Sequence, residues 1–473
     1  MKLHRICAYC LAAAFAGCAA VGPDYQRPEV ELPQSYPDAA AMTGAAKPLA
    51  ANWWTLYGDA QLDELVQLAL ERNADIRMAV ARIEEADANL REAGAAFLPE
   101  IDLGATPARS RASSRAAVPI PNGIPVYRND MRAVLSTSFE LDFWGRLRRG
   151  VEAVRAQALG TRYARDVVAL TLSGLTAQTY FSLRSLDAQL AVTRETLRVR
   201  QDVLDFVRRR ANGGIASQLD VSQAEGTRAD ASAQLKDLER QRALAEHQLA
   251  VLTGRPGAGL SGGDLRKLPT PPLPPAGLPS LLIERRPDIR QAEQLLISAN
   301  AQIGVARAAM LPTISLTSFY GGQSQALATL LTSGANIWSI GFGLTLPIFD
   351  AGRFAARTDA AVARQHQALA AYQKSIETGF REVADALSGI RQLSAAENDF
   401  RTRSSAARNA LRLARLRYEA GYSAFLEVLD AERSANDAEL AEMRNRQALL
   451  SATVDLMKAL GGGWSDGTNT GAR

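Results

Sequence analysis

The sequence predicts an α+β membrane protein with an internally duplicated chain, in which four strands accompany very long helices. Proline placement is the first observation: of 20 prolines, none lies between Val126 and Arg255 and none follows Pro347. Because proline breaks a helix interior, such tracts permit long helices. The second observation is that the two halves of the chain match each other. The third is that short segments in each half alternate between apolar and small or polar residues.

The chain begins with the pattern of an export signal. Lys2 and Arg5 precede Ile6–Gly17, a nearly uncharged apolar stretch that is shorter than the ~20 residues needed to span a bilayer as a helix. The small residues before Cys18 resemble a bacterial lipobox, so we expect residues 1–17 to be a signal peptide and Cys18 to be the lipidated first residue. The alternative is an ordinary signal peptide with an incidental cysteine.

A lipid-anchored N-terminal segment and equatorial part is expected over 18–60, followed by the first structural repeat over 61–254. Within this repeat we predict a short helix over about Gln61–Ala96, a β-hairpin over 97–145, and long helices over 146–211 and 217–254. The first long tract carries a stripe at 3–4 spacing, made of Leu186, Leu190, Thr193, Leu197, Arg200, Leu204 and Val207. This spacing is typical of coiled-coil-like packing. The arginine inside the stripe is interpreted as a snorkelling or interface residue.

The second structural repeat is expected over 280–461. A proline-rich linker over 255–279 precedes it, and a C-terminal tail over 462–473 follows it. By the same criteria we predict a short helix over about Pro279–Ala309, a β-hairpin over 311–350, and long helices over 352–420 and 424–461.

Two registers relate the halves of the chain. Glu71–Arg77 matches Glu284–Arg290 at a separation of 213 residues, and Gly214 matches Gly421 at a separation of 207 residues. Chance similarity between alanine-rich helices is the alternative. Registers held over such distances indicate an internal duplication instead.

The strand segments alternate strictly. In the second half, apolar residues occupy every other position at Trp338, Ile340, Phe342, Leu344, Leu346 and Ile348. This alternation is typical of a transmembrane β-strand and also of a half-buried soluble strand. The export signal and the lack of another long apolar run favour the transmembrane interpretation. Four strands leave open edges in lipid, so copies must pool their strands: two copies would give 8, three 12 and four 16.

The composition offers little for catalysis or nucleic-acid binding. Lys and Arg number 54 against 50 Asp and Glu, so the net charge is only +4. No cysteine follows Cys18 and only three histidines are present, which excludes clustered thiolate or imidazole ligands. The HExxH, P-loop and GxSxG motifs are missing. We therefore expect no enzyme activity, no catalytic residue, no cofactor, no metal site and no nucleic-acid partner.

Several motifs carry a family resemblance. They are Cys18–Pro28, Trp53-Trp54, Glu284–Ile289, Ala309–Pro312, Arg417–Gly421, Leu426–Arg433 and Ala459–Trp464. Over essentially the whole mature chain they resemble the outer membrane factors, the TolC-like outer membrane efflux lipoproteins of resistance-nodulation-division (RND) systems. The resemblance implies a homotrimer, with a 12-stranded transmembrane β-barrel continuous with a long periplasmic α-helical barrel.

The resemblance also implies a function and partners. The protein would be the passive exit duct of a tripartite efflux system, held in outer membrane lipid and extending into the periplasm. It would dock on a periplasmic adaptor protein and an inner-membrane RND-type pump. The alternative is a lipid-anchored periplasmic coiled-coil scaffold or adaptor without a pore, which would explain the helices but neither the strands nor the duplication.

The turns between the long helices are predicted as the inner tips of the molecule. They comprise Gly213, Gly214, Ile215, Ala216 and Ser217 in the first repeat, and Gly421, Tyr422 and Ser423 in the second. Glycine supplies the positive φ that such turns need. A pure turn is the alternative interpretation, and the resemblance adds contact with the adaptor.

A candidate gate follows the second tip. Leu426, Asp430 and Arg433 lie at i, i+4 and i+7, so they share one face of a helix. In the resembled family this motif closes the periplasmic aperture, and we expect a periplasmic gate here, with Arg417 and Tyr418 across the turn as latch partners. The alternative is an exposed Asp–Arg helix pair with no gating role.

Overall fold

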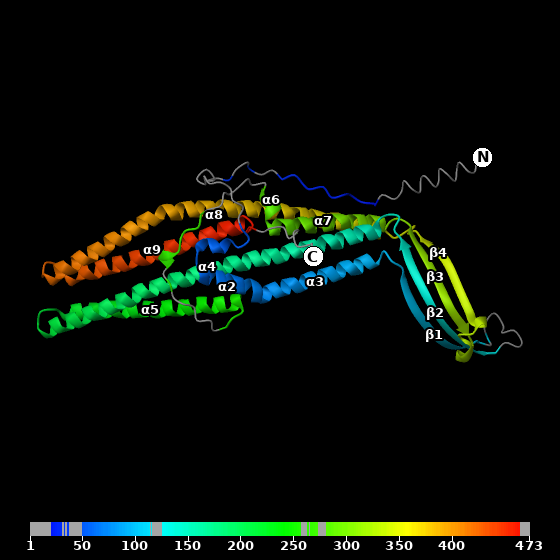
Figure 1. Ribbon diagram of the computed structural model, residues 1–473, viewed down its shortest axis with the longest axis horizontal. Helices are drawn as coiled ribbons and strands as arrows, with labels where there is room; N and C mark the ends of the chain where they lie inside the picture. The colour runs from blue at the N-terminus through cyan, green and yellow to red at the C-terminus, as the bar shows by residue number, and fades with distance from the viewer. Residues whose placement is uncertain are drawn as a thin grey trace. The chain divides into compact units, whose positions relative to one another are not determined.

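The computed structural model describes residues 20–30, 33, 36, 50–113, 115, 125–256, 263, 265–272 and 281–463. These residues are mostly helical, with one four-stranded antiparallel sheet (Figure 1). An α+β chain with four strands and very long helices is therefore confirmed. The predicted signal peptide, the lipidation site Cys18 and residues 464–473 of the predicted tail lie outside the described residues.

The chain forms two compact units. One comprises Met1–Pro28, Ile83–Gly160 and Ala292–Ala371 and contains all four strands. The other comprises Glu29–Arg82, Thr161–Gln291 and Tyr372–Arg473 and contains most of the length of the long helices.

The helices repeat in order along the two halves of the chain. The first half contains α2 (Ala60–Arg72), α3 (Ala74–Ala95), α4 (Arg146–Asn212) and α5 (Gln218–Thr253). The second contains α6 (Leu281–Arg285), α7 (Pro287–Ala308), α8 (Arg353–Glu419) and α9 (Phe425–Ala459). Helices α4 and α8 both have 67 residues, which corresponds to ~100 Å at 1.5 Å per residue. Each folds back on the next helix as a long hairpin (Figure 1).

The short helices predicted as single pieces over Gln61–Ala96 and Pro279–Ala309 are each broken in two. The first break is at Asn73, which is extended and whose side-chain oxygen accepts a hydrogen bond from the backbone N–H of Asp75 at 2.7 Å. The second is at Arg286, which precedes Pro287, and proline disfavours helical geometry in the residue before it. Predicting one continuous helix in each repeat was therefore wrong.

The two breaks place side chains that cap a distant helix. Asn73 Nδ2 donates to the carbonyl of Leu252 at 2.9 Å, and Arg286 Nη1 donates to the carbonyl of Ala459 at 3.1 Å. Leu252 and Ala459 are related by the 207-residue register and lie at the ends of α5 and α9. Both donors thus satisfy carbonyls that the end of a helix leaves open, and the duplication extends to this contact.

The predicted stripe of α4 is buried. Leu190 and Thr193 are 1% and 0% exposed, and Leu204 and Val207 are 4% and 0% exposed. The stripe packs in part against α5, which contributes Leu235, Leu238 and Leu249 to the same core cluster. Apolar burial along this seam stabilises the hairpin, at roughly 25 cal/mol per Å² of area removed from water.

The sheet has the order β1 (Glu100–Arg111), β2 (Tyr127–Leu141), β3 (Thr313–Ser324), β4 (Asn336–Thr345). Residues paired across all four strands form a row of exposed apolar side chains: Leu103, Leu135, Tyr320 and Trp338, which are 74%, 49%, 60% and 71% exposed. The next row, which alternation places on the other face, is largely polar and holds Asp102, Ser136 and Ser339, around a hollow of about 330 Å³.

The segment 20–30 is tied to α7 and to the start of α4. Arg27 forms a two-pronged ion pair with the buried carboxylate of Glu293, at 2.7 and 3.0 Å. Asp24 pairs with Arg149 at 2.5 Å, and Asn300 Nδ2 donates to the carbonyl of Pro23 at 2.8 Å. The chain that follows Cys18 is therefore fixed to the unit that carries the sheet.

Candidate functional site

The first tip closes α4 and opens α5. Gly214 has φ +72°, and the N–H of Ile215 donates to the carbonyl of Arg210 at 2.9 Å, which is a Schellman arrangement. Ser217 caps α5 with a capping box, because its Oγ accepts from Asp220 N while the Asp220 carboxylate accepts from Ser217 N. The predicted tip residues Gly213, Gly214, Ile215, Ala216 and Ser217 all lie in this turn. Ile215 is 69% exposed.

The second tip repeats the turn but not the cap. Gly421 has φ +80°, and the N–H of Tyr422 donates to the carbonyl of Arg417 at 2.8 Å. Ala424 stands where the first repeat has its capping serine, and α9 has no side-chain cap. The Oγ of Ser423 is buried without a hydrogen-bond partner, and Tyr422 is 80% exposed. The second tip thus presents an exposed aromatic ring on a less secured turn.

An apolar cluster joins the two tips within one chain, and we call it the tip cluster. Its buried members are Leu204, Val207, Val221, Ala224, Phe425 and Val428. Tyr418 packs against it, with its ring 5.3 Å from the ring of Phe425 and 5.4 Å from the guanidinium carbon of Arg210. Burial raises the pKa of the Tyr418 hydroxyl, so the ring is neutral at physiological pH. Tyr418 therefore links the second hairpin to the first.

The three candidate gate residues lie together on an exposed face of α9. Leu426 is 62% exposed, and Arg433 forms an ion pair with Asp430 at 2.9 Å, with side chains 72% and 65% exposed. An exposed pair of this kind contributes ~0–1 kcal/mol to stability. Within the described residues, neither Arg417 nor Tyr418 forms a hydrogen bond or ion pair with this group. The predicted latch partners are thus not joined to the gate face within one copy.

A buried ion-pair cluster lies behind the gate face, and sequence reasoning missed its role. We call it the charged node: Glu432 on α9, Arg415 on α8 and Arg200 on α4. Arg415 Nη2 lies 2.7 Å from one Glu432 oxygen, and Arg200 Nε lies 4.0 Å from the other. The Glu432 side chain is 5% exposed. Arg200 Nη1 also donates to the carbonyl of Thr227 on α5 at 2.7 Å, so one carboxylate connects all four long helices.

The one sequence feature that pointed to the charged node is Arg200, a charged residue inside the apolar stripe of α4. The sequence supported reading it as an interface residue, but not the partner it contacts. Glu432 was also visible as the duplicate of Glu225, and Arg415 as the duplicate of Arg208, at 207 residues. In the first repeat that same pair is 2.5 Å apart but about half exposed on both sides.

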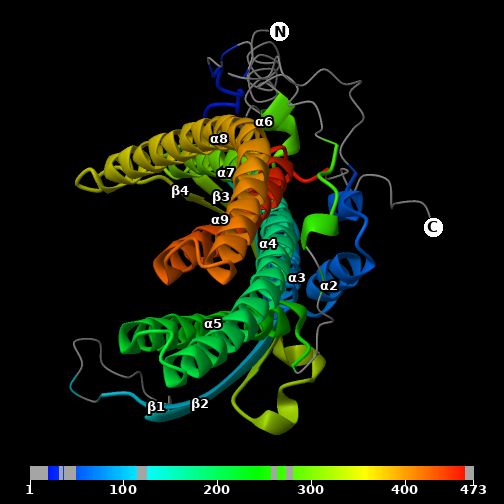
Figure 2. The same ribbon diagram turned by 90° about the vertical axis from the view of Figure 1, so that its left-hand side faces the viewer.

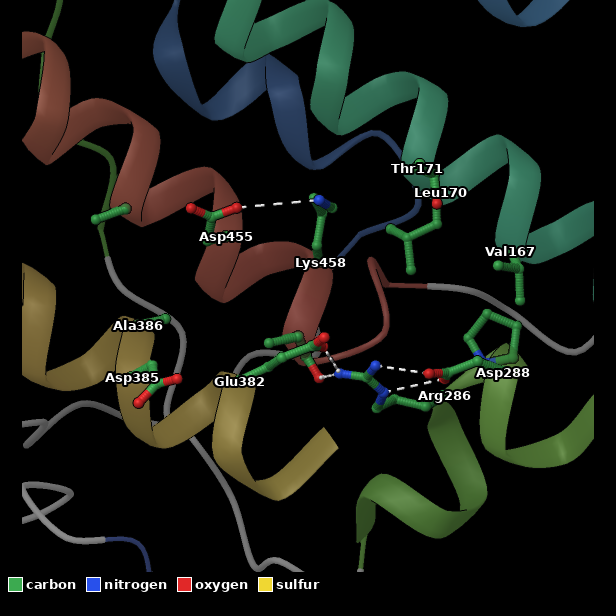
Figure 3. Close-up of a pocket in the computed structure, with 13 residues that line it drawn as sticks. Val167, Leu170, Thr171, Arg286, Asp288, Glu382, Asp385, Ala386, Asp455 and Lys458 are labelled. Atoms are coloured by element: carbon green, nitrogen blue, oxygen red, sulfur yellow. Dashed lines mark hydrogen bonds and ion pairs between the residues drawn. The ribbon is translucent and has the colours of Figure 1, made fainter. Parts of the chain in front are cut away.

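A pocket of about 460 Å³ lies between α4, α8, α9 and the start of α7 (Figure 3). The guanidinium of Arg286 crosses it, paired with Asp288 at 2.6 Å and Glu382 at 2.8 Å. Asp455 faces Lys458 at 3.9 Å and accepts from Gln178 at 2.7 Å, and burial raises the pKa of its carboxyl. The two cations on the wall are thus both paired with carboxylates of the wall, which indicates that the pocket is a structural junction between helices.

Among the described residues, no three His, Cys, Asp or Glu side chains come together as a possible metal site. In the same residues, no helix is long and apolar enough to cross a membrane.

Comparison with known proteins covers both repeats. The family described as Outer membrane efflux protein matches residues 65–255 and 278–462. The chain is 36% identical to Outer membrane protein OprJ of Pseudomonas aeruginosa, over 97% of this chain and 95% of OprJ. It is 34% identical to the Cation efflux system protein CusC of Escherichia coli, over 98% of this chain and 100% of CusC. The crystal structure of the Campylobacter jejuni CmeC outer membrane channel superposes with a TM-score of 0.89 at 25% identity, covering 96% of this chain and 97% of CmeC.

Proposed function

This chain belongs to the outer membrane efflux protein family, and from that premise we propose that three copies assemble into one continuous exit duct. The protein is an outer membrane efflux channel that extends into the periplasm, as its relatives are. Members of the family are channels and not enzymes. The alternative of a pore-free scaffold or adaptor is not supported by these relationships.

The observation that carries the trimer is the sheet. Among the described residues, strands β1 and β4 each pair with one neighbour only, and the row through Leu103 and Trp338 exposes apolar side chains on one face. Edges left open in lipid would leave backbone groups unsatisfied, so β4 of one copy should pair with β1 of the next. Three copies of four strands would form a 12-stranded barrel, with the row through Asp102 and Ser136 lining its lumen.

The trimer and its conduction are tested together. We expect the purified protein to run as a trimer in mild detergent by mass photometry and to pass K⁺ and Cl⁻ across a planar bilayer. A monomeric protein without conductance would overturn the proposal and favour the alternative of a scaffold without a pore.

The partners follow from the tips. We propose that the tip residues named above contact a periplasmic adaptor, with the exposed side chains of Ile215 and Tyr422 as apolar contacts, and that the adaptor connects the duct to an inner-membrane RND-type pump. Replacing Tyr422 by Ser should weaken cross-linking to the adaptor without changing the trimer. The names of the relatives CusC and OprJ do not point to one shared substrate. We therefore propose that the pump, and not this chain, selects the exported substrate.

The gate is proposed on α9. Three copies of Leu426, Asp430 and Arg433 would approach the threefold axis and narrow the periplasmic end, with Arg417 and Tyr418 supporting the turn. Opposed Asp430 carboxylates repel each other, and Arg433 one turn away would offset that repulsion. Replacing Asp430 and Arg433 by Ala together should raise single-channel conductance and sensitise cells to vancomycin.

The gate has a matched control in the first repeat, where Gln223 occupies the position equivalent to Asp430. Gln223→Ala should leave conductance within about twofold of the parent. If the double Ala variant assembles as a trimer and conducts like the parent, the gate assignment is wrong while the channel stands.

Acylation of Cys18 is proposed as the lipid anchor in the outer membrane. Intact mass should show a chain that begins at Cys18 and carries diacylglycerol and an amide-linked acyl chain. Because residues 20–30 are tied to the unit that carries the sheet, Cys18→Ser should impair assembly more than membrane retention. A chain with an unmodified N-terminus at another residue would contradict the proposal.

A further inference from the structure

One face of the sheet is almost free of charged residues. The pairing register runs without interruption through all three strand pairs, so each residue of a strand can be assigned to one face. We call the side of Leu103 and Trp338 the apolar face and the opposite side the polar face. Every carboxylate of the four strands lies on the polar face: Glu100, Asp102, Asp130 and Glu140.

Within the four strands, the charged residues of the apolar face are Arg109 and Arg111, at the end of β1. They pair with Asn129 and Tyr127 of β2, and these two strands lie side by side at one edge of the sheet (Figure 2). Both guanidinium carbons lie 5.8 Å from the centre of the Tyr127 ring, a distance at which the ring attracts a cation. One aromatic ring thus holds two positive charges together on an otherwise uncharged face.

No carboxylate of the sheet compensates these two charges. The carboxylates of the strands lie on the other face, and within the described part of the chain neither Arg109 nor Arg111 forms an ion pair. Two like charges beside one ring repel each other, so an anion that contacts both would offset the repulsion. Because a guanidinium group matches a phosphate group in bidentate geometry, phosphate is the ligand chemistry that fits this pair.

The place of the two arginines along the strand indicates where such a phosphate comes from. Strand β1 begins after α3 and β2 leads into α4, so the end of β1 lies at the end of the sheet away from these helices. In the proposed duct the long helices point into the periplasm, and this end of the sheet faces outwards. Arg109 lies six residues beyond Leu103, which corresponds to about 16 Å along the membrane normal at ~3.4 Å per residue and a tilt of roughly 40°.

We propose that Arg109 and Arg111 form a binding site for the phosphate groups of lipopolysaccharide, the phosphorylated glycolipid of the outer leaflet. This rests on the proposed barrel, whose apolar face contacts lipid. Pairing with β4 of a neighbouring copy would extend the edge of β1 and leave its two faces unchanged, so the arginines stay on the lipid side of a closed barrel. Basic residues next to an apolar membrane surface attract anionic lipid headgroups.

Binding of lipopolysaccharide to the full-length protein in mild detergent tests the proposal. The two probes are lipopolysaccharide that lacks O-antigen and the same lipid after removal of its phosphates, and the dissociation constant of each is measured by thermophoresis. We expect the parent protein to bind the phosphorylated lipid at least fivefold more tightly than the dephosphorylated one. Replacing Arg109 and Arg111 by Ala together should reduce this preference to less than twofold, because acyl-chain contacts alone remain.

The polar face supplies a matched control. Arg128→Ala with Arg132→Ala removes two arginines from the polar face of the neighbouring strand β2 and should keep the parent's preference. Arg109→Gln alone should lose about half of it, and it gives the same test if the double variant does not assemble.

The proposal is overturned if the parent binds both lipids equally, if the variants of Arg109 and Arg111 keep the full preference, or if the polar-face control loses it as well. Each protein is also tested for K⁺ and Cl⁻ current across a planar bilayer. A parent without current would refute the channel, whereas a conducting protein without lipid preference would refute the lipid site alone.

Discussion

Arg286 should be the more costly of the two duplicated capping residues to remove. Its guanidinium is 7% exposed and makes two hydrogen bonds to Asp288, an ion pair to Glu382 at 2.8 Å and a hydrogen bond to the carbonyl of Ala459 at 3.1 Å. Removing one partner of a buried pair costs about 3–5 kcal/mol. The side chains of Asp288 and Glu382 are 33% and 41% exposed, so water can solvate them once the arginine is gone. We therefore expect Arg286→Ala to lower the free energy of unfolding by the low end of this range, about 3 kcal/mol per copy.

The first repeat supplies the control. Asn73 donates one neutral hydrogen bond to Leu252 and caps α3 through Asp75, so Asn73→Ala should cost about 2 kcal/mol, from ~1 for the bond and ~1 for the cap. Arg286→Asn copies the first-repeat solution at the second site and should recover about half of the loss caused by Arg286→Ala.

The assay is the rate of unfolding in detergent, because a large protein of this kind is expected to unfold irreversibly, so that its stability is kinetic. If the contacts of Arg286 are absent from the transition state, 3 kcal/mol corresponds to an unfolding rate roughly 150-fold faster. The reasoning is refuted if Arg286→Ala unfolds within threefold of the parent, or if Asn73→Ala unfolds faster than Arg286→Ala.

Three further predictions concern local stability. Ala424→Ser should stabilise the second tip by about 1 kcal/mol, because it supplies α9 with the cap that Ser217 gives α5. Hydrogen exchange of the first turn of α9 measures this gain, and equal protection in the variant and the parent would contradict the prediction. Arg27→Glu should lower trimer yield several-fold, and adding Glu293→Arg should restore it, as seen by native electrophoresis; no rescue would mean that the ion pair is not what matters. Burial raises the pKa of the Asp166 carboxyl, so the folded chain holds that proton more tightly and stability falls as pH rises from about 4; Asp166→Asn should flatten this decline in thermal scans.

Regular structure was predictable because its causes are local. The absence of proline permits α4 and α8, the 3–4 stripe predicts α4, and strict alternation predicts β4. The bounds of the long helices agree with the structure to within two residues, since glycines at positions such as 214 and 421 end them by a local turn.

The breaks at Asn73 and Arg286 were not predictable from local pattern in the same way. The partners that make these residues useful, the carbonyls of Leu252 and Ala459, lie more than 170 residues away in the sequence. Pro287 was the one local clue, and the duplication could have transferred its boundary to the first repeat.

The candidate site was predicted only in part for a related reason. Spacing placed Leu426, Asp430 and Arg433 on one face, because a helix face depends on periodicity alone. The proposed latch role of Tyr418 came instead from its position across the turn, and within one copy the Tyr418 ring lies against Arg210 of the other hairpin. Periodicity states which residues share a face, but not which helix that face meets.

Duplication makes this missing information partly recoverable. The two repeats share one fold, so a contact found in one repeat specifies the two corresponding positions of the other. Where both positions keep their residues, as Arg208 and Glu225 keep those of Arg415 and Glu432, the contact belongs to a hairpin and appears in each repeat. Where the residues differ, as Ala424 differs from the capping Ser217, the contact belongs to one repeat only.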